Sequence, residues 1–117
     1  MSRSWTFTSL VSGNPLTFTE VARERELEIA EIVGDYRLVL GKLERTERGW
    51  AVVITNHGYS ADVSYFEEGL EPFPTANAAA RWIASGEARD AISAAMEWAY
   101  QEAAEAWYEE QMMYPYG

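Results

Sequence analysis

Carboxylates are the most numerous side chains in this sequence that could take part in chemistry. The chain has 19 Asp and Glu residues, nine Lys and Arg residues, a single histidine, His57, and no cysteine. Catalytic or zinc sites built from thiolates or several imidazoles therefore lack their side chains. A carboxylate pair could act as general acid and base, but no pair lies beside a Gly-rich or aromatic segment that would mark a sugar or phosphate cleft. We expect a protein that is not an enzyme and binds no cofactor.

Four acids near the middle of the chain could bind a divalent cation weakly. Asp62, Glu67, Glu68 and Glu71 lie within ten residues of one another, and carboxylate oxygens are the ligands that Ca²⁺ and Mg²⁺ prefer. Their spacing is not that of an EF-hand loop, and the sequence also lacks a P-loop and a Gly-rich dinucleotide motif. The prediction is that the chain has no metal site.

The negative charge is concentrated in the second half of the chain. The formal net charge is −10; residues 1–60 have eight acids and seven bases, and residues 61–117 have eleven acids and two bases. Phosphate contacts need clustered Lys and Arg, so direct nucleic-acid binding is not expected. A surface of this sign suits a basic protein partner, although an acidic surface can also serve solubility alone.

A long helix carries most of these acids. Residues 87–113 are rich in Ala, Glu, Gln and Met and lack Gly and Pro, which predicts a helix. One side of it is a predicted core stripe that packs on the sheet: Ala88, Ile92, Ala95, Met96, Ala99, Ala103, Ala106 and Trp107. The opposite side collects Glu87, Asp90, Glu97, Gln101, Glu102, Glu105 and Glu109. No Lys or Arg follows Arg89, so these carboxylates have no basic i,i+4 neighbour further along the helix to compensate their charge.

Aromatic side chains project into this acidic sector. Trp98 and Tyr108 fall there, with Met112 nearby, and such residues are enriched in protein interfaces. The predicted partner-binding surface consists of Asp62, Glu67, Glu68, Glu71, Asp90, Glu97, Trp98, Glu102, Glu105, Tyr108 and Glu109. The first four belong to it only if the loop that holds them lies near the helix. Alternatively, Trp98, Tyr108 and Met112 pack beneath another part of the chain or in a dimer seam.

The remaining segments predict a small antiparallel sheet. Alternating apolar residues indicate strands at about 5–10, 36–45, 50–55 and 60–66, with turns at 46–49 and 56–58. Thr17 and Glu20 have capping-box spacing ahead of a 3.6-residue apolar stripe, which predicts a helix over 18–33, with a strand over 26–33 as the alternative. Thr75 is placed to cap a helix over 76–85 that ends at Gly86. The prediction is one α+β domain, residues 1–117, in which three to four antiparallel strands pack against two or three helices.

We expect the protein to be soluble and cytoplasmic. The first eight residues carry one positive charge but no apolar run of signal-peptide length. The longest weakly charged stretch, residues 88–98, still contains Arg89, Asp90 and Glu97, which a membrane span would not tolerate.

In size and charge, the chain resembles small anti-defence proteins of phages and mobile elements, such as anti-CRISPR proteins and antirestriction DNA mimics, and immunity proteins against nucleases. The resemblance rests on the acids of residues 87–110, with no sequence motif behind it. It implies a stoichiometric inhibitor whose acidic helix occupies the basic nucleic-acid-binding surface of a partner, through electrostatic attraction. The alternative is a structural or assembly protein that forms a homo-oligomer through the aromatic residues of its last helix.

Overall fold

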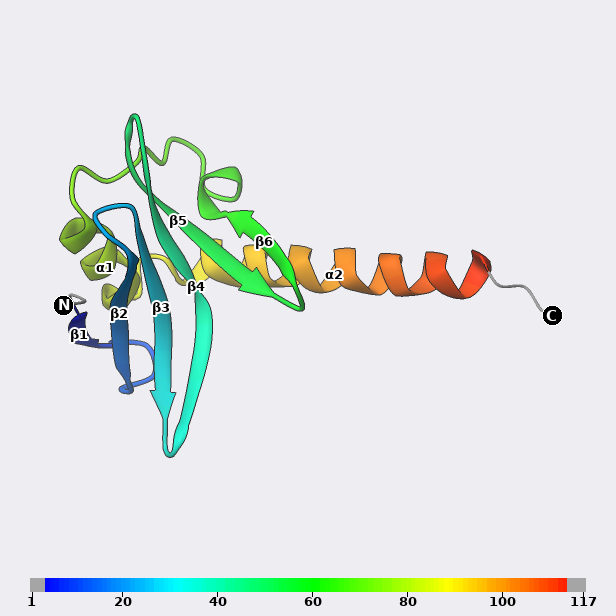
Figure 1. Ribbon diagram of the computed structural model, residues 1–117, viewed down its shortest axis with the longest axis horizontal. Coiled ribbons are helices and arrows are strands. Elements are labelled where there is room, and N and C mark those ends of the chain that lie inside the picture. The colour runs from blue at the N-terminus through cyan, green and yellow to red at the C-terminus, as the bar shows by residue number, and fades with distance from the viewer. Residues whose placement is uncertain (1–3, 114–117) are drawn as a thin grey trace.

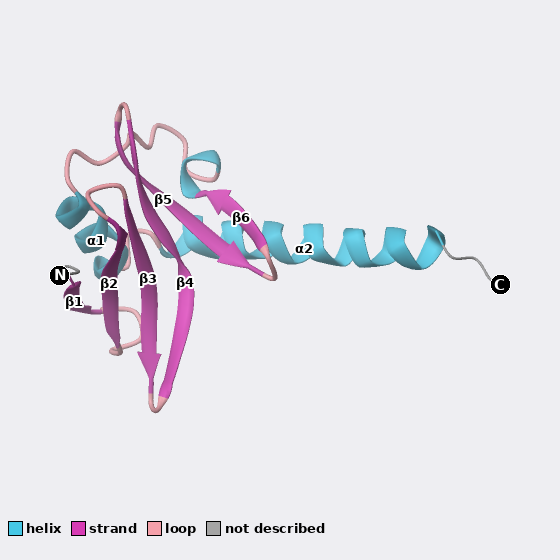
Figure 2. Cartoon of the chain, in the orientation of Figure 1, coloured by secondary structure: helices cyan, strands magenta, loops and turns pink. Residues whose placement is uncertain are grey.

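Six antiparallel strands form one sheet, followed by a short 3₁₀ helix and two α-helices (Figures 1 and 2). This computed structural model describes residues 4–113, and their side chains through residue 110. The strands are β1 (Ser4–Thr8), β2 (Pro15–Ala22), β3 (Glu26–Val33), β4 (Tyr36–Thr46), β5 (Gly49–Asn56) and β6 (Tyr59–Asp62). The helices are η1 (Val63–Tyr65), α1 (Ala76–Ser85) and α2 (Arg89–Met113). Each strand pairs with its neighbour in chain order, as an antiparallel meander.

The prediction of a three- or four-stranded sheet is wrong, because the segment predicted as a helix over residues 18–33 forms most of β2 and all of β3. The alternative of a strand over residues 26–33 is confirmed. The chain turns between these strands without Gly or Pro. Glu24 takes the left-handed conformation, with φ of 57°, and its N–H donates to the Glu20 carboxylate at 3.2 Å. Sequence patterns mark such turns mainly through Gly, Asn and Pro, so this one gave no signal.

The core lies on the face of the sheet that the helices cover. A row of register partners crosses five strands, from Phe18 through Ile29, Gly41 and Ile54 to Ala61. Gly41 is required here because a side chain would meet the backbone of β5, with Ile54 Cα at 2.9 Å. The core cluster includes buried alanines and Ile83 from α1 and alanines from α2.

The two helices predicted in the C-terminal part of the chain, over residues 76–85 and 87–113, are both present as α-helices. Thr75 caps α1, since its hydroxyl accepts from the Ala78 N–H at 3.1 Å, and Gly86 ends the helix with φ of 90°. The long helix α2 begins two residues later than predicted, at Arg89. α1 contacts β1 and β5, and α2 contacts β5, β6 and η1. Neither helix in the described part of the chain combines the length and the apolar character that a membrane crossing needs.

Candidate functional site

The outer half of α2 extends past the sheet. The last contacts with the sheet lie at the tip of the β5–β6 hairpin, where the Asn56 amide donates to the Met96 carbonyl at 3.1 Å. The His57 ring meets the Tyr100 ring edge to face, with centroids 5.5 Å apart. Residues 104–110 are then exposed without exception, and Figure 1 shows these turns projecting away from the body of the protein. We call residues 101–113 the helical arm.

The predicted core stripe of α2 packs on the sheet only along its inner half. Ala88, Ala95 and Ala99 are fully buried, whereas Ala106 is exposed and Trp107 is 61% exposed. Length explains the difference, because the 25 residues of α2 span about 37 Å. β6, the strand beside it, has four residues and covers about 14 Å. The apolar stripe therefore continues onto a surface with nothing packed against it in the described structure.

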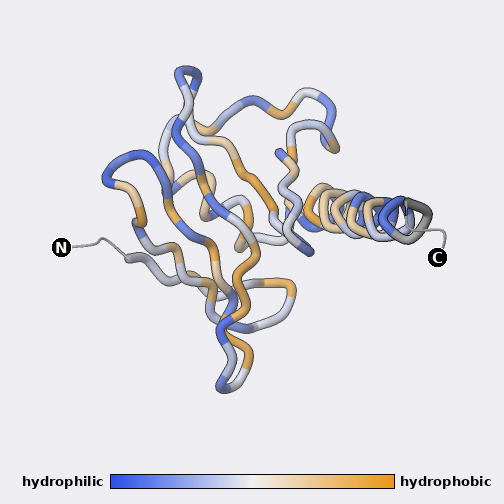
Figure 3. The backbone as a smooth tube through the Cα atoms, turned by 45° about the vertical axis from the view of Figure 1, so that its right-hand side comes forward, coloured by the Kyte–Doolittle hydropathy of each residue, from blue (hydrophilic) through white to orange (hydrophobic). Residues whose placement is uncertain are grey.

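Uncompensated carboxylates line α2 toward its outer end. Five glutamates fall between positions 97 and 110, a rise of about 20 Å, so successive negative charges are on average ~5 Å apart along the helix axis. Among the described residues, no α2 carboxylate forms an ion pair. Figure 3 shows hydrophilic positions recurring along these turns. The last turn has no basic residue, so the negative end of the helix dipole adds to the same field.

The arm places acids and aromatic rings side by side. Spacings of four, three and four residues put Trp98, Glu102, Glu105 and Glu109 along one side of the helix. Glu102 is half-buried, and the others are exposed. Tyr108 is 63% exposed and lines a shallow hollow with Glu105 and Glu109. The structure thus brings together four predicted site residues on the arm itself: Glu102, Glu105, Tyr108 and Glu109.

The two predicted acids nearer the start of α2 lie off the arm. Asp90 sits in the first turn, where the helix dipole stabilises a carboxylate. Glu97 is exposed, one turn before the arm, and accepts a long hydrogen bond of 3.5 Å from the Gln101 amide. Glu97 therefore extends the arm's charge toward the sheet, whereas Asp90 has a local role in the helix.

Asp62 lines the same hollow as the predicted aromatic residue Trp98. The two side chains line a hollow of about 390 Å³ with Tyr65 and Phe66. An Asp62 carboxylate oxygen also accepts from the Ser64 N–H at 2.9 Å, as the cap of η1. Its charge is therefore partly engaged by the local backbone.

The other loop acids are not assembled with the arm. Glu71 lies in a different pocket and pairs with Arg48 at 3.0 Å. Glu67 is half-buried, with one carboxylate oxygen that has no hydrogen-bond partner, and Glu68 is exposed in the same loop. Neither lines the hollow beside Trp98. The prediction that this loop extends the acidic face therefore has structural support only at Asp62.

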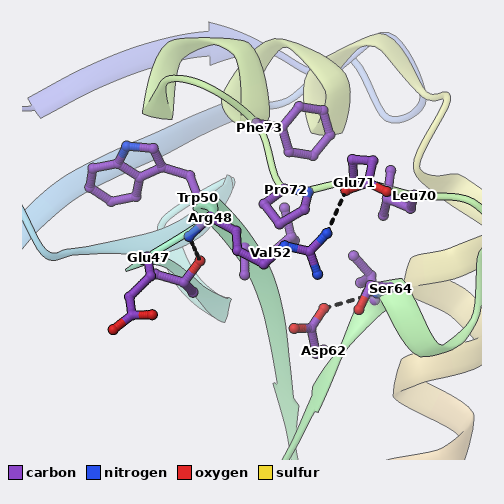
Figure 4. Close-up of a pocket in the computed structure, with 13 residues that line it drawn as sticks. Glu47, Arg48, Trp50, Val52, Asp62, Ser64, Leu70, Glu71, Pro72 and Phe73 are labelled. Atoms are coloured by element: carbon purple, nitrogen blue, oxygen red, sulfur yellow. Dashed lines mark hydrogen bonds and ion pairs between the residues drawn. The ribbon is translucent and has the colours of Figure 1, made fainter.

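A pocket of about 490 Å³ lies at the edge of β5, where β6 ends (Figure 4). The chain returns to that edge at Phe73, whose N–H and C=O pair with those of Trp50 at 2.9 and 2.7 Å. Arg48 reaches toward Glu71 across the pocket. Two carboxylates that line the pocket, those of Asp62 and Glu71, already accept hydrogen bonds. Across the described residues, no group of three acidic or histidine side chains is arranged to hold a metal ion.

Two basic side chains of the sheet, those of Arg37 and Lys42, are paired with neighbouring acids. Arg37 pairs with Glu28, and Lys42 lies 3.0 Å from Glu26 and 3.9 Å from Glu44. The hydrogen bond to Glu26 raises the pKa of Lys42, with smaller contributions from the charges of Glu26 and Glu44, while desolvation acts in the opposite direction. These two positive charges of the sheet are thus balanced locally, whereas the described carboxylates of the arm form no ion pair.

The sequence prediction missed three exposed residues near or on the arm. Trp107 was assigned to the core, while Tyr100 and Glu110 were not singled out. A comparison of helix length with strand length would have indicated that the end of α2 is exposed. α2 is about 37 Å long, whereas β5 and β6, on which it packs, have eight and four residues and are shorter. The side chain of Met112 lies outside the described residues.

Comparison with known proteins adds no relative: no family model, curated protein or solved structure matches this chain.

Proposed function

We propose that this protein is a non-enzymatic inhibitor that binds a partner stoichiometrically through the helical arm. The arm occupies a basic, nucleic-acid-binding surface of that partner, in the manner of anti-CRISPR proteins and DNA mimics. The observation that carries the proposal is the uncompensated acidic helix, exposed on all sides over residues 104–110.

Stability does not account for the charge on the arm. Glu105 and Glu109 are like charges at i,i+4, which destabilise a helix by a few tenths of a kcal/mol per pair. Glu109 and Glu110 also lie near the C-terminal end, where negative charge opposes the helix dipole. An isolated helical segment is marginal in water, so contact with a basic partner would relieve both effects. Solubility alone would be served equally well by acids spread over the whole surface.

Salt-dependent capture tests this proposal. The immobilised protein is expected to retain basic, nucleic-acid-binding proteins from a lysate at 50 mM salt and to release them by about 300 mM, since electrostatic association is screened by salt. The retained proteins should also be displaced by added DNA, because both ligands would use one surface.

The matched variants are two triple charge reversals. One changes Glu102, Glu105 and Glu109 to Lys; the control changes Glu24, Asp35 and Glu47, three exposed acids of the sheet turns, to Lys. Net charge changes equally in both. The arm variant should lose capture and the turn variant should keep it. Equal capture by both variants would refute the role of the arm.

A second candidate function is supported by the exposed stripe of Ala106 and Trp107, which continues the buried face of α2. In that case, two copies associate through their arms, as an assembly protein. The salt dependence separates the two functions, because association of like-charged arms strengthens as salt rises and binding to a basic partner weakens.

A further inference from the structure

The spacing of charge along the arm is closer to that of one nucleic-acid strand than to that of a duplex. The four glutamates of the arm, from position 102 to position 110, are on average ~4 Å apart along the helix axis. A single DNA strand has one phosphate per ~3.4 Å, and a duplex has one charge per ~1.7 Å. On this measure the arm has the charge density of a single strand.

The arrangement of the acids leads to the same comparison. Three of the arm's four glutamates, Glu102, Glu105 and Glu109, lie along one side of the helix. A duplex instead presents two phosphate lines, about 12 Å apart across its major groove. In the part of the chain that the structure describes, nothing flanks residues 104–110 to supply a second line.

Exposed aromatic rings are the third property that the arm shares with a single strand. Trp107 and Tyr108 are 61% and 63% exposed, and they lie between Glu105 and Glu109 in the sequence. Proteins that bind single strands combine a basic groove with aromatic side chains on which unpaired bases stack. Such a groove can accept tyrosine and tryptophan rings in place of bases, since the rings stack in the same way.

We infer that the arm imitates single-stranded nucleic acid and docks in the basic, aromatic-lined groove of a single-strand-binding protein. This inference rests on the proposed function and specifies its partner. The charges of the arm face the Lys and Arg residues of the groove, and Trp107 and Tyr108 occupy positions of stacked bases.

Displacement of labelled oligonucleotides from purified proteins tests the inference. The full chain competes at 50 mM salt for two single-strand binders, one with an OB-fold and one with RNA-recognition motifs, and for two duplex binders, a helix-turn-helix repressor and a zinc-finger protein. Fluorescence anisotropy of the labelled oligonucleotide reports displacement. We expect half-displacement from at least one single-strand binder at a concentration at least tenfold lower than from either duplex binder.

Aromatic variants test the stacking contribution. Replacing Trp107 and Tyr108 together by alanine should weaken displacement of the single strand at least tenfold, by the scale of base–aromatic stacking. Circular dichroism checks that helix content is kept. Tyr36→Ala is the matched control, because Tyr36 is 78% exposed at the start of β4, off the arm, and it should leave displacement unchanged.

Each remaining outcome has a distinct meaning. Equal displacement from both classes, or preference for the duplex binders, would overturn the inference and leave the proposed function in place. The same would follow if the Trp107/Tyr108 variant displaced single strands as well as the unaltered chain. Failure to displace any of the four, together with failure of salt-dependent capture, would overturn the proposed function as well.

Discussion

At the scale of single residues, acids of the sheet near Lys42 have a basic neighbour, whereas the described acids of the arm do not. Lys42 stands between two cross-strand acids, Glu26 and Glu44, which are register partners and would otherwise face each other unscreened. Directly opposed like charges destabilise a sheet. On the arm, Glu105 and Glu109 have no such mediator among the described residues. The difference makes Lys42 a measurable contributor to stability.

We expect Lys42→Gln to lower the free energy of unfolding at pH 7 by less than about 1 kcal/mol, since the ion pair is partly exposed and screened. The folded-state pKa of Lys42 is raised above 10.5. Its contribution is therefore fully present below the unfolded-state pKa and is lost as the pH rises through the folded-state pKa. Urea unfolding of both proteins at pH 7 and above pH 10.5 measures this.

The control for this prediction is Arg45→Gln, which changes an exposed base of the same strand. The stability difference caused by Lys42→Gln should shrink at alkaline pH, while that of Arg45→Gln should not. A Lys42 effect that is the same at both pH values would show that packing of its alkyl chain, and not its charge, supports the strands.

At the scale of elements, the sequence predicted those that begin and end with distinctive residues. Thr75 and Gly86 delimit α1, Gly49 begins β5 directly after one hairpin turn, and Gly58 lies in the turn that follows β5. The turn between β2 and β3 has Glu24 in the left-handed conformation, a position where most non-glycine residues are uncommon. Without a recognisable turn, two strands were predicted as one helix.

The candidate site was predictable as a helix face but not as a free arm. The 3.6-residue period assigns Trp98, Glu105 and Tyr108 to the side of α2 away from Ala95 and Ala99, as found. Periodicity does not say where the sheet ends, because that depends on strand length and on the position of the β5–β6 hairpin. Trp107 follows the apolar period and is nevertheless exposed.

We expect removal of residues 104–117 to change the free energy of unfolding by no more than about 0.5 kcal/mol, the usual range for surface changes. The described side chains of this segment are exposed, so little apolar area is returned to water. Chemical unfolding measures the stability, and circular dichroism at 222 nm should show the lost helix. The truncated chain should also lose salt-dependent capture.

Truncation before residue 96 is the comparison that locates the boundary. It removes Ala99 and the Met96 carbonyl that accepts from Asn56, and it should lower stability by about 2 kcal/mol or more, the scale of a buried core truncation. If removal of residues 104–117 were equally destabilising, the arm would have to pack against the body of the protein in solution.

At the scale of the whole molecule, a charge-balanced sheet supports a uniformly acidic projection. Of the net charge of −10, all but −1 comes from residues 61–117. β5 and β6 hold the inner half of α2, where Ala95 and Ala99 are fully buried, and this fixes the direction of the arm. Such an arrangement suits binding in which the arm enters a groove while the sheet remains outside it.

The oligomeric state decides whether the arm is available for that role. We expect a monomer in sedimentation velocity at micromolar concentration between 50 and 500 mM salt, because pairing two arms would bring their glutamates together, and such repulsion is strongest at low salt. Trp107→Ala should then leave the sedimentation coefficient unchanged. A dimer that strengthens as salt rises and dissociates in Trp107→Ala would assign the exposed apolar stripe to self-association. In that case the acids of the arm would form the outer surface of an assembly, and the groove-binding proposal would lose its contact surface.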